Sequence, residues 1–131
     1  MTPVPGAGAL RAALYVAGAV ATAAGLHTVI AGARSIAGQG AANASVESEL
    51  RFYAAFYVAY GVAALRVAPR ADQEGAALRA LAGALFLGGL ARAGGWRAVG
   101  RPHAGQRALL AIELAGPPAL AAWQSRLAAQ M

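Results

Sequence analysis

Glu113 is the residue of this chain with the most evident capacity for chemistry, because it is an acid in an apolar run. No other charged residue occurs in residues 108–123. A carboxylate inside a membrane is costly unless it is paired or protonated. A paired acid would fix helix packing, whereas a protonatable acid could carry protons or exchange them for a substrate. The interpretation therefore depends on which residues meet Glu113.

Other chemistry is hard to place in this sequence. Cysteine is absent, which excludes disulfides and thiolate metal sites. The two histidines, His27 and His103, have no second ligand at a suitable spacing for a metal ion. No nucleophile and base pair is evident, and no glycine pattern follows a strand as a nucleotide loop requires. We therefore expect no enzyme, no metal and no cofactor.

The composition indicates a membrane protein of one domain, residues 1–131. The chain is 59% hydrophobic and 12% charged, whereas soluble domains carry about 25% charged residues. The outside of the fold must therefore face lipid or a large partner. All eleven basic residues are Arg, and they lie mostly at the ends of apolar runs. That dispersed pattern is typical of residues that flank membrane helices, and it argues against a nucleic-acid partner.

Four apolar segments predict four helices, because each approaches the roughly 20 residues that a membrane span needs. Their expected bounds are about residues 12–33, 47–66, 76–92 and 107–126. Short loops between them predict an all-α, antiparallel four-helix transmembrane bundle with both termini on the same side. Two alternatives are a cleaved signal after residues 21–23 and a soluble bundle. The apolar run continues beyond residue 23, and the segments lack a polar face.

Glycines and tyrosines mark two faces of the predicted helices. Gly18, Gly25 and Gly32 recur every seven residues, which predicts close approach by a neighbouring helix. A second stripe at helical spacing consists of Glu49, Tyr53, Tyr57 and Tyr60. The tyrosines would form either a polar track into the bundle or ordinary packed aromatics. His27 would be a hydrogen-bonded core residue, a proton relay or a lipid-facing residue.

The topology gathers charges around Glu113. With four antiparallel helices, the first and third end beside the starts of the second and fourth. Arg92 follows small residues spaced by four, at positions 80, 84 and 88, so it should face a neighbouring helix. We expect an Arg92–Glu113 pair, with Arg51 as a second cation and Glu49 nearby. Further cations of this leaflet could contact lipid headgroups, namely Arg97, Arg101, His103 and Arg107.

Several motifs resemble a known family. They are ELRFY at residues 49–53, LFLGGLAR at 85–92, GRP at 100–102, IELAGPP at 112–118 and WQ at 123–124. Together they are similar to small bacterial four-helix membrane proteins known as domain of unknown function 4345. The resemblance covers almost the whole chain from the first helix onward. It implies an integral membrane protein with four helices, and it implies no reaction, substrate or partner.

The sequence supports three hypotheses of function. The first is a small multi-pass membrane protein of unknown function whose buried Glu and Arg residues are structural. The alternatives are a proton-coupled or anion transporter working as a homodimer, and a lipid-binding or accessory subunit of a larger complex. The expected location is the bacterial inner membrane. With Arg51 and Arg92 set aside, five Arg flank the terminus side against four on the other, which favours cytoplasmic termini.

Overall fold

The computed structural model describes residues 4–131 and consists of four long helices. They are α1 (Ala7–Ala31), α2 (Ala44–Val67), α3 (Gly75–Val99) and α4 (Ala104–Ala128), with 3₁₀ turns η1 (Gly32–Ser35) and η2 (Ala68–Arg70). Residues 4–131 contain no strand, so the all-α prediction is confirmed. The sequence predicts that α3 ends near residue 92, whereas it continues through Gly94 and Gly95 to Val99. Glycine lowers helix propensity by about 1 kcal/mol but does not forbid helix.

Three of the helices are long and apolar enough to cross a membrane. They are α1 with η1, α2 with η2, and α3. A helix of 25 residues, the length of α3, extends about 37 Å, which exceeds a hydrocarbon core of about 30 Å. The fourth helix, α4, has the same length, but it is not among the three apolar candidates. It contains polar residues at several points, among them Gln106, Arg107, Glu113 and Gln124.

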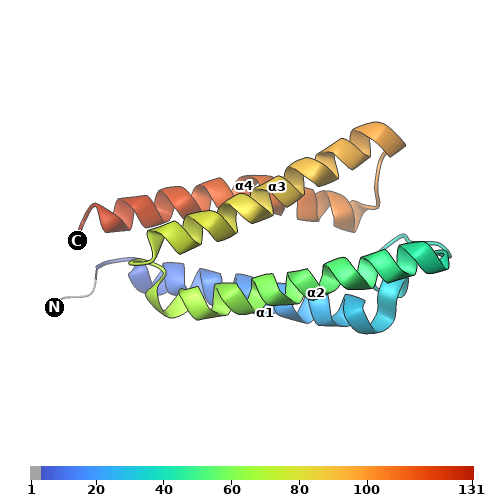
Figure 1. The fold of residues 1–131 in the computed structure, drawn as a ribbon. Helices are drawn as coiled ribbons and strands as arrows, with labels where there is room; N and C mark the ends of the chain where they lie inside the picture. The colour runs from blue at the N-terminus through green and yellow to red at the C-terminus, as the bar shows by residue number, and fades with distance from the viewer. Residues whose placement is uncertain (1–3) are drawn as a thin grey trace.

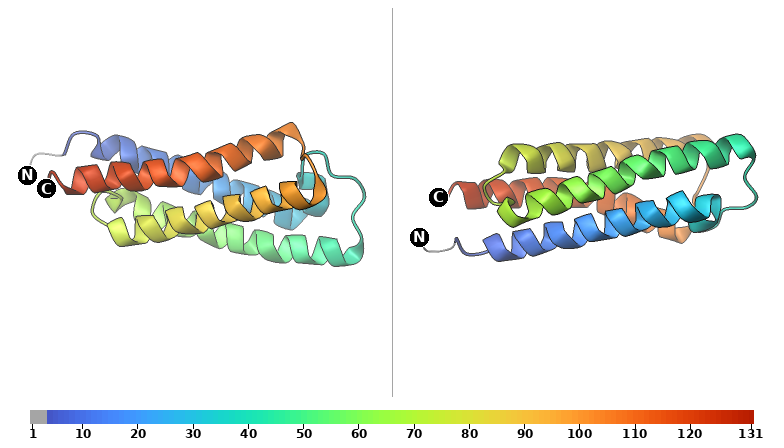
Figure 2. Two further views of the ribbon diagram at one scale, coloured as in Figure 1. Left: turned by 90° about the horizontal axis from the view of Figure 1, so that it is seen from above. Right: turned by 60° about the horizontal axis from the view of Figure 1, so that its bottom comes forward.

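The helices form two hairpins that share a core at the end with the chain termini and contact each other again at the far end, where a Cβ added at Gly38 would lie 2.9 Å from the Cβ of His103. Figures 1 and 2 show α1 beside α2 and α3 beside α4, with both chain termini at the same end. In Figure 1 the far end of α3 rises away from α2. The shared core lies near the termini and draws on every helix. Its buried members are Ala7, Leu10, Leu14, Ala64, Ala68, Ala71, Leu78 and Leu127.

Glycines let the backbones of α1 and α2 approach closely. A Cβ added at Gly61 would lie 2.5 Å from the Thr22 backbone nitrogen. One added at Gly25 would lie 2.8 Å from the Val58 nitrogen, and one at Gly18 would lie 3.0 Å from the Gly61 carbonyl oxygen. Two members of the predicted glycine stripe therefore contact the backbone of α2, and the third, Gly32, lies against the α2 side chain of Glu47. In lipid such close packing is a main source of helix association.

Replacing Gly61 by Ala should separate α1 from α2, because the new methyl group meets backbone atoms that cannot move independently. We expect a loss of about 1–3 kcal/mol in the free energy of unfolding, the usual effect of overpacking. The measurement is thermal unfolding of the detergent-purified protein. The matched control is Gly94→Ala in α3, where an added Cβ has no neighbour within 4 Å. Equal melting temperatures for the two variants would contradict the close contact.

Candidate functional site

Arg92 of α3 and Glu113 of α4 form a two-pronged ion pair. The Arg92 Nε lies 2.8 Å from Oε2 of Glu113, and Nη2 lies 2.9 Å from Oε1. The third nitrogen, Nη1, donates to the side-chain oxygen of Gln106, two turns earlier in α4. Glu113 is buried, with 7% of its surface exposed. Both carboxylate oxygens therefore have charge-assisted hydrogen bonds, the strongest kind available to a side chain.

Gly89 brings the two helices together at this pair. It precedes Arg92 by three residues, so the two share a face of α3. A Cβ added at Gly89 would lie 3.0 Å from the Cβ of Glu113 and 2.9 Å from Cδ2 of Leu114. The spacing of small residues predicts Gly88 on the contact face, and this prediction is wrong, because Gly88 is exposed and a Cβ there would have no neighbour within 4 Å. Arg92 still reaches Glu113 from its position on α3, because its side chain is long.

Two prolines follow Glu113 by one turn. Pro117 and Pro118 lie inside α4, and proline has no backbone N–H. The carbonyl oxygens of Glu113 and Leu114 therefore lack the hydrogen bond that an α-helix normally provides from four residues ahead. The buried acid sits where the backbone ladder of α4 is interrupted.

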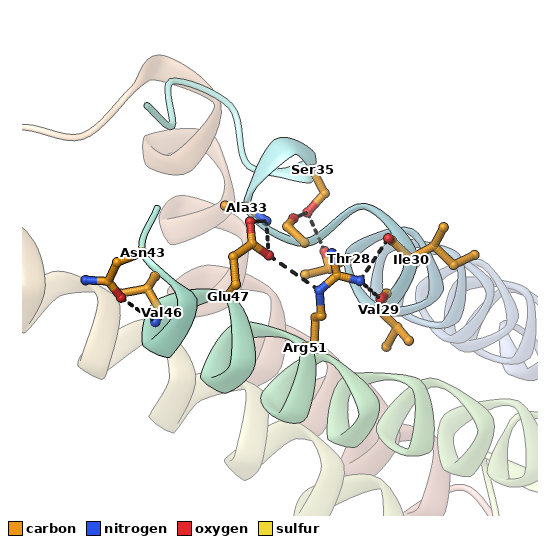
Figure 3. Close-up of polar contacts among 10 residues, drawn as sticks. Thr28, Val29, Ile30, Ala33, Ser35, Asn43, Val46, Glu47 and Arg51 are labelled. Atoms are coloured by element: carbon orange, nitrogen blue, oxygen red, sulfur yellow. Dashed lines mark hydrogen bonds and ion pairs between the residues drawn. The ribbon is translucent and has the colours of Figure 1, made fainter. Parts of the chain in front are cut away.

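Arg51 does not join the Arg92–Glu113 pair, contrary to the prediction. Its Nη1 donates to the carbonyl oxygens of Val29 at 2.8 Å and Ile30 at 3.0 Å (Figure 3). These carbonyls belong to the last turn of α1, where backbone acceptors have no partner within the helix and favour a cation. Arg51, which the sequence predicts beside Glu113, therefore binds the free carbonyl oxygens at the end of α1 instead.

Glu47, which the sequence analysis missed, completes this cap. Its carboxylate accepts hydrogen bonds from the Ala33 nitrogen at 3.2 and 3.3 Å, and it lies 3.4 Å from Nε of Arg51 (Figure 3). Gly32 has φ +61°, and the Glu47 carboxylate fills the place that a Cβ would occupy there. The four-residue spacing of Glu47 and Arg51 is the signal that could have indicated the pair. Glu49 is exposed and has no ion-pair partner in residues 4–131, so placing it in the cluster is wrong.

Of the predicted tyrosine track, one hydroxyl makes a hydrogen bond within the described residues. Tyr60 donates to the carbonyl oxygen of Leu81 at 2.9 Å and thereby links α2 to α3. The Tyr57 ring stacks on that of Tyr60, with centroids 6.0 Å apart, whereas Tyr53 is 64% exposed. His27 is exposed on α1, which favours the lipid-facing alternative.

The predicted headgroup residues have different surroundings. Arg97 and Arg101 are exposed. His103 caps α4, because its Nδ1 accepts from the Gly105 nitrogen at 3.1 Å. Arg107 is partly buried, and its Nε has no hydrogen-bond partner in the described residues. Two of the four therefore remain free at the surface as cations.

A second, partly buried ion pair, which the sequence did not predict, joins the two hairpins. Arg11 of α1 donates from Nε to Oδ1 of Asp72 at 2.7 Å and from Nη2 to Oδ2 at 3.0 Å. Gln124 of α4 donates to the Asp72 carbonyl oxygen at 3.2 Å. Asp72 is 4% exposed, and the hydrogen bonds from Arg11 hold the pKa of its carboxyl below the usual value. The predicted topology puts Arg11 and Asp72 at the same end of the bundle. The polar residues around Asp72 predict a loop there but do not single out Asp72 as the partner of Arg11.

A family model described as domain of unknown function (DUF4345) matches residues 9–124. The chain belongs to the DUF4345 family. No curated protein and no solved structure matches the chain. The family match spans both buried ion pairs, the α1 cap and the two prolines. These contacts therefore all lie within the region that the family model matches.

The stability that the Arg11–Asp72 pair gives this DUF4345 domain should depend on pH. The folded state lowers the pKa of Asp72, so the pair stabilises the fold above the unfolded value of about 3.9. That stability is lost as the pH falls through the folded-state pKa. We expect Asp72→Asn to lower the melting temperature at neutral pH, and the gap to wild type to shrink below about pH 4. Exposed Glu49→Gln is the control, and an unchanged gap in acid would contradict the assignment.

Proposed function

We propose that this chain is a multi-pass integral membrane protein of the bacterial inner membrane and not an enzyme, with buried Arg–carboxylate pairs that fix its helix packing. The observation that carries the proposal is the Arg92–Glu113 pair, in which both carboxylate oxygens are bound. The carboxylate and the guanidinium bind each other, and this contact holds α3 against α4. In this function the charges specify which helices are neighbours.

The outer surface supports the membrane location. Large apolar side chains stand outward on all four helices, among them Val16, Ile30, Phe52, Phe56, Leu87 and Ile112, each at least 59% exposed. In water each such side chain would forgo about 1.5–3 kcal/mol of burial free energy. Lipid solvates these side chains at no such penalty, and the Arg residues at the helix ends reach the headgroups.

The geometry favours a structural role over proton-coupled transport. A carrier acid must alternate between a proton and a substrate, so it needs to be free in one state. Glu113 would first have to leave Arg92, which would leave an uncompensated buried charge. Gln106 holds Arg92 from the other side, so the guanidinium is not free for an anion either. The homodimeric transporter is therefore the less supported alternative.

The positions of the two histidines support the proposal that the chain is not an enzyme. His27 is exposed on α1, and His103 uses Nδ1 to cap α4. A general base must lie within hydrogen-bond reach of the proton that it removes. Nδ1 of His103 is thus occupied by a structural contact, and His27 lies on the outer surface of α1.

Variants of the Arg92–Glu113 pair test the structural role. Arg92→Leu leaves the buried Glu113 unpaired, so it should cost about 3–5 kcal/mol of unfolding free energy. Glu113→Leu orphans Arg92 and should cost somewhat less, because the Arg92 side chain is 33% exposed against 10% for Glu113. The double replacement should be more stable than Arg92→Leu alone. The measurement is detergent unfolding of the four proteins as a double-mutant cycle.

Two results would contradict this role. One is additive losses, which would mean that the two side chains do not act together. The other is substrate-dependent proton movement in proteoliposomes that disappears in Glu113→Gln while the melting temperature is unchanged. The second result would favour the transporter.

C-terminal fusions test the membrane location and the proposed cytoplasmic termini. A green fluorescent protein fusion should stay in the membrane fraction through alkaline carbonate extraction and should fluoresce. A phosphatase fusion at the same residue should be inactive, because that enzyme requires the periplasm. Release by carbonate would contradict membrane integration. The opposite reporter pattern would reverse the orientation without changing the fold.

A further inference from the structure

We propose that the groove between α3 and α4 binds one phospholipid with an anionic headgroup, with the phosphate at Arg79 and an acyl chain along the groove. The inference rests on the proposed membrane location. It concerns a different place from the headgroup residues predicted at the opposite end of the helices.

The groove is shallow and open to the surface, and its lining suits an acyl chain that lies along it. Its volume is about 250 Å³, and Arg79, Gly83 and Phe86 of α3 line one side while Pro117, Pro118 and Ala121 of α4 line the other. The α3 residues are spaced by three and four, so they form a continuous stripe. From Arg79 to Phe86 the stripe extends about 10 Å along the helix axis.

Small residues keep the groove open. A Cβ added at Gly83 would have no neighbour within 4 Å, so the space above it is unfilled. On α4 the compact rings of Pro117 and Pro118 and the methyl group of Ala121 replace longer side chains. Apart from Arg79 the lining residues are apolar, so a hydrocarbon chain is a suitable occupant.

Arg79 is a cation with no acid to neutralise it. Its closest polar contact is the neutral side-chain oxygen of Gln124, at 3.5 Å from Nη1. In residues 4–131 no carboxylate forms an ion pair with it, whereas Arg11, Arg70 and Arg92 each hold one. Arg79 is exposed and lies four residues after the start of α3, where a headgroup would be. A guanidinium binds phosphate oxygens in two-pronged geometry.

The charges favour a lipid over a second copy of this chain. A helix from a second copy would have to bring an acid to Arg79. At this end of the bundle the acids are Asp72 and Glu74, and both are already bound, to Arg11 and Arg70. The free acid, Glu49, lies near the start of α2, at the opposite end of the molecule. An anionic phospholipid supplies the missing negative charge and the apolar chain together.

Native mass spectrometry of the full chain tests the site. The purified protein is mixed with equal amounts of phosphatidylglycerol and phosphatidylcholine that have the same acyl chains. Wild type should retain phosphatidylglycerol preferentially. Arg79→Gln should lower that preference about fivefold, the usual effect of one basic residue near anionic lipid. Gly83→Leu should fill the groove and reduce the retention of both lipids.

Matched variants control for folding and for general charge. Arg126→Gln removes an exposed Arg of α4 that does not line the groove. Gly88→Leu adds the same side chain to α3 where there is also room. Both should retain lipid as wild type does, and all variants should melt within a few degrees of it.

Three results would overturn the proposal. They are equal retention of the two lipids by wild type, equal retention by Gly83→Leu and Gly88→Leu, and a dimer that Gly83→Leu converts to a monomer. The last would assign the groove to a second copy. In each case the chain would still resist carbonate extraction, so the lipid site can fail while the membrane location stands.

Discussion

A carboxylate inside an apolar bundle must have a partner, and much of this fold follows from that constraint. In the proposed membrane setting, apolar burial does little to hold helices together, because the surrounding lipid chains are as apolar as the side chains. Selectivity then falls to the few polar groups and to close backbone packing. Glu113 can be accommodated on α4 because Arg92 lies opposite, and Arg92 can reach it because Gly89 removes a side chain between the helices. One ion pair thus makes α3 and α4 neighbours.

The same principle operates at different places with different partners. Arg11 and Asp72 join the first hairpin to the loop that begins the second, beside the shared core. Glu47 and Arg51 cap the end of α1, where the groups that need hydrogen-bond partners are backbone N–H and C=O groups and not a buried acid. Between these fixed points α1 and α2 rely on glycine contacts and form the tighter hairpin. The two hairpins share a core near the termini, and at the other end α3 rises away from α2 while Gly38 still contacts His103 at the start of α4.

The sequence was sufficient for the features that depend on composition and topology. Long apolar segments predict the helices, and the alternation of direction brings Arg92 and Glu113 together. It was insufficient where geometry decides. Gly88 and Gly89 differ by about 100° around a helix axis. The four-residue spacing of small residues from position 80 predicted Gly88 on the contact face and could not show that Gly89 lies there instead. Arg51 had two plausible destinations, and the positive φ of Gly32 favours the α1 cap by opening a place for Glu47. Helix α4 was predicted as a fourth membrane span from its apolar run, but it is more polar than its neighbours and is not among the three helices apolar enough to cross a membrane.

The two prolines after Glu113 have a consequence for biosynthesis. A nascent α4 would present to the bilayer the carboxylate of Glu113 and, at the same place in the helix, the carbonyl oxygens of Glu113 and Leu114, which Pro117 and Pro118 leave without backbone partners. Each of these groups disfavours partitioning of the segment by itself. Once α3 is alongside, Arg92 compensates the acid. In the proposed membrane setting, the insertion machinery would therefore have to retain α3 until α4 has emerged from the ribosome and release the two helices to lipid together.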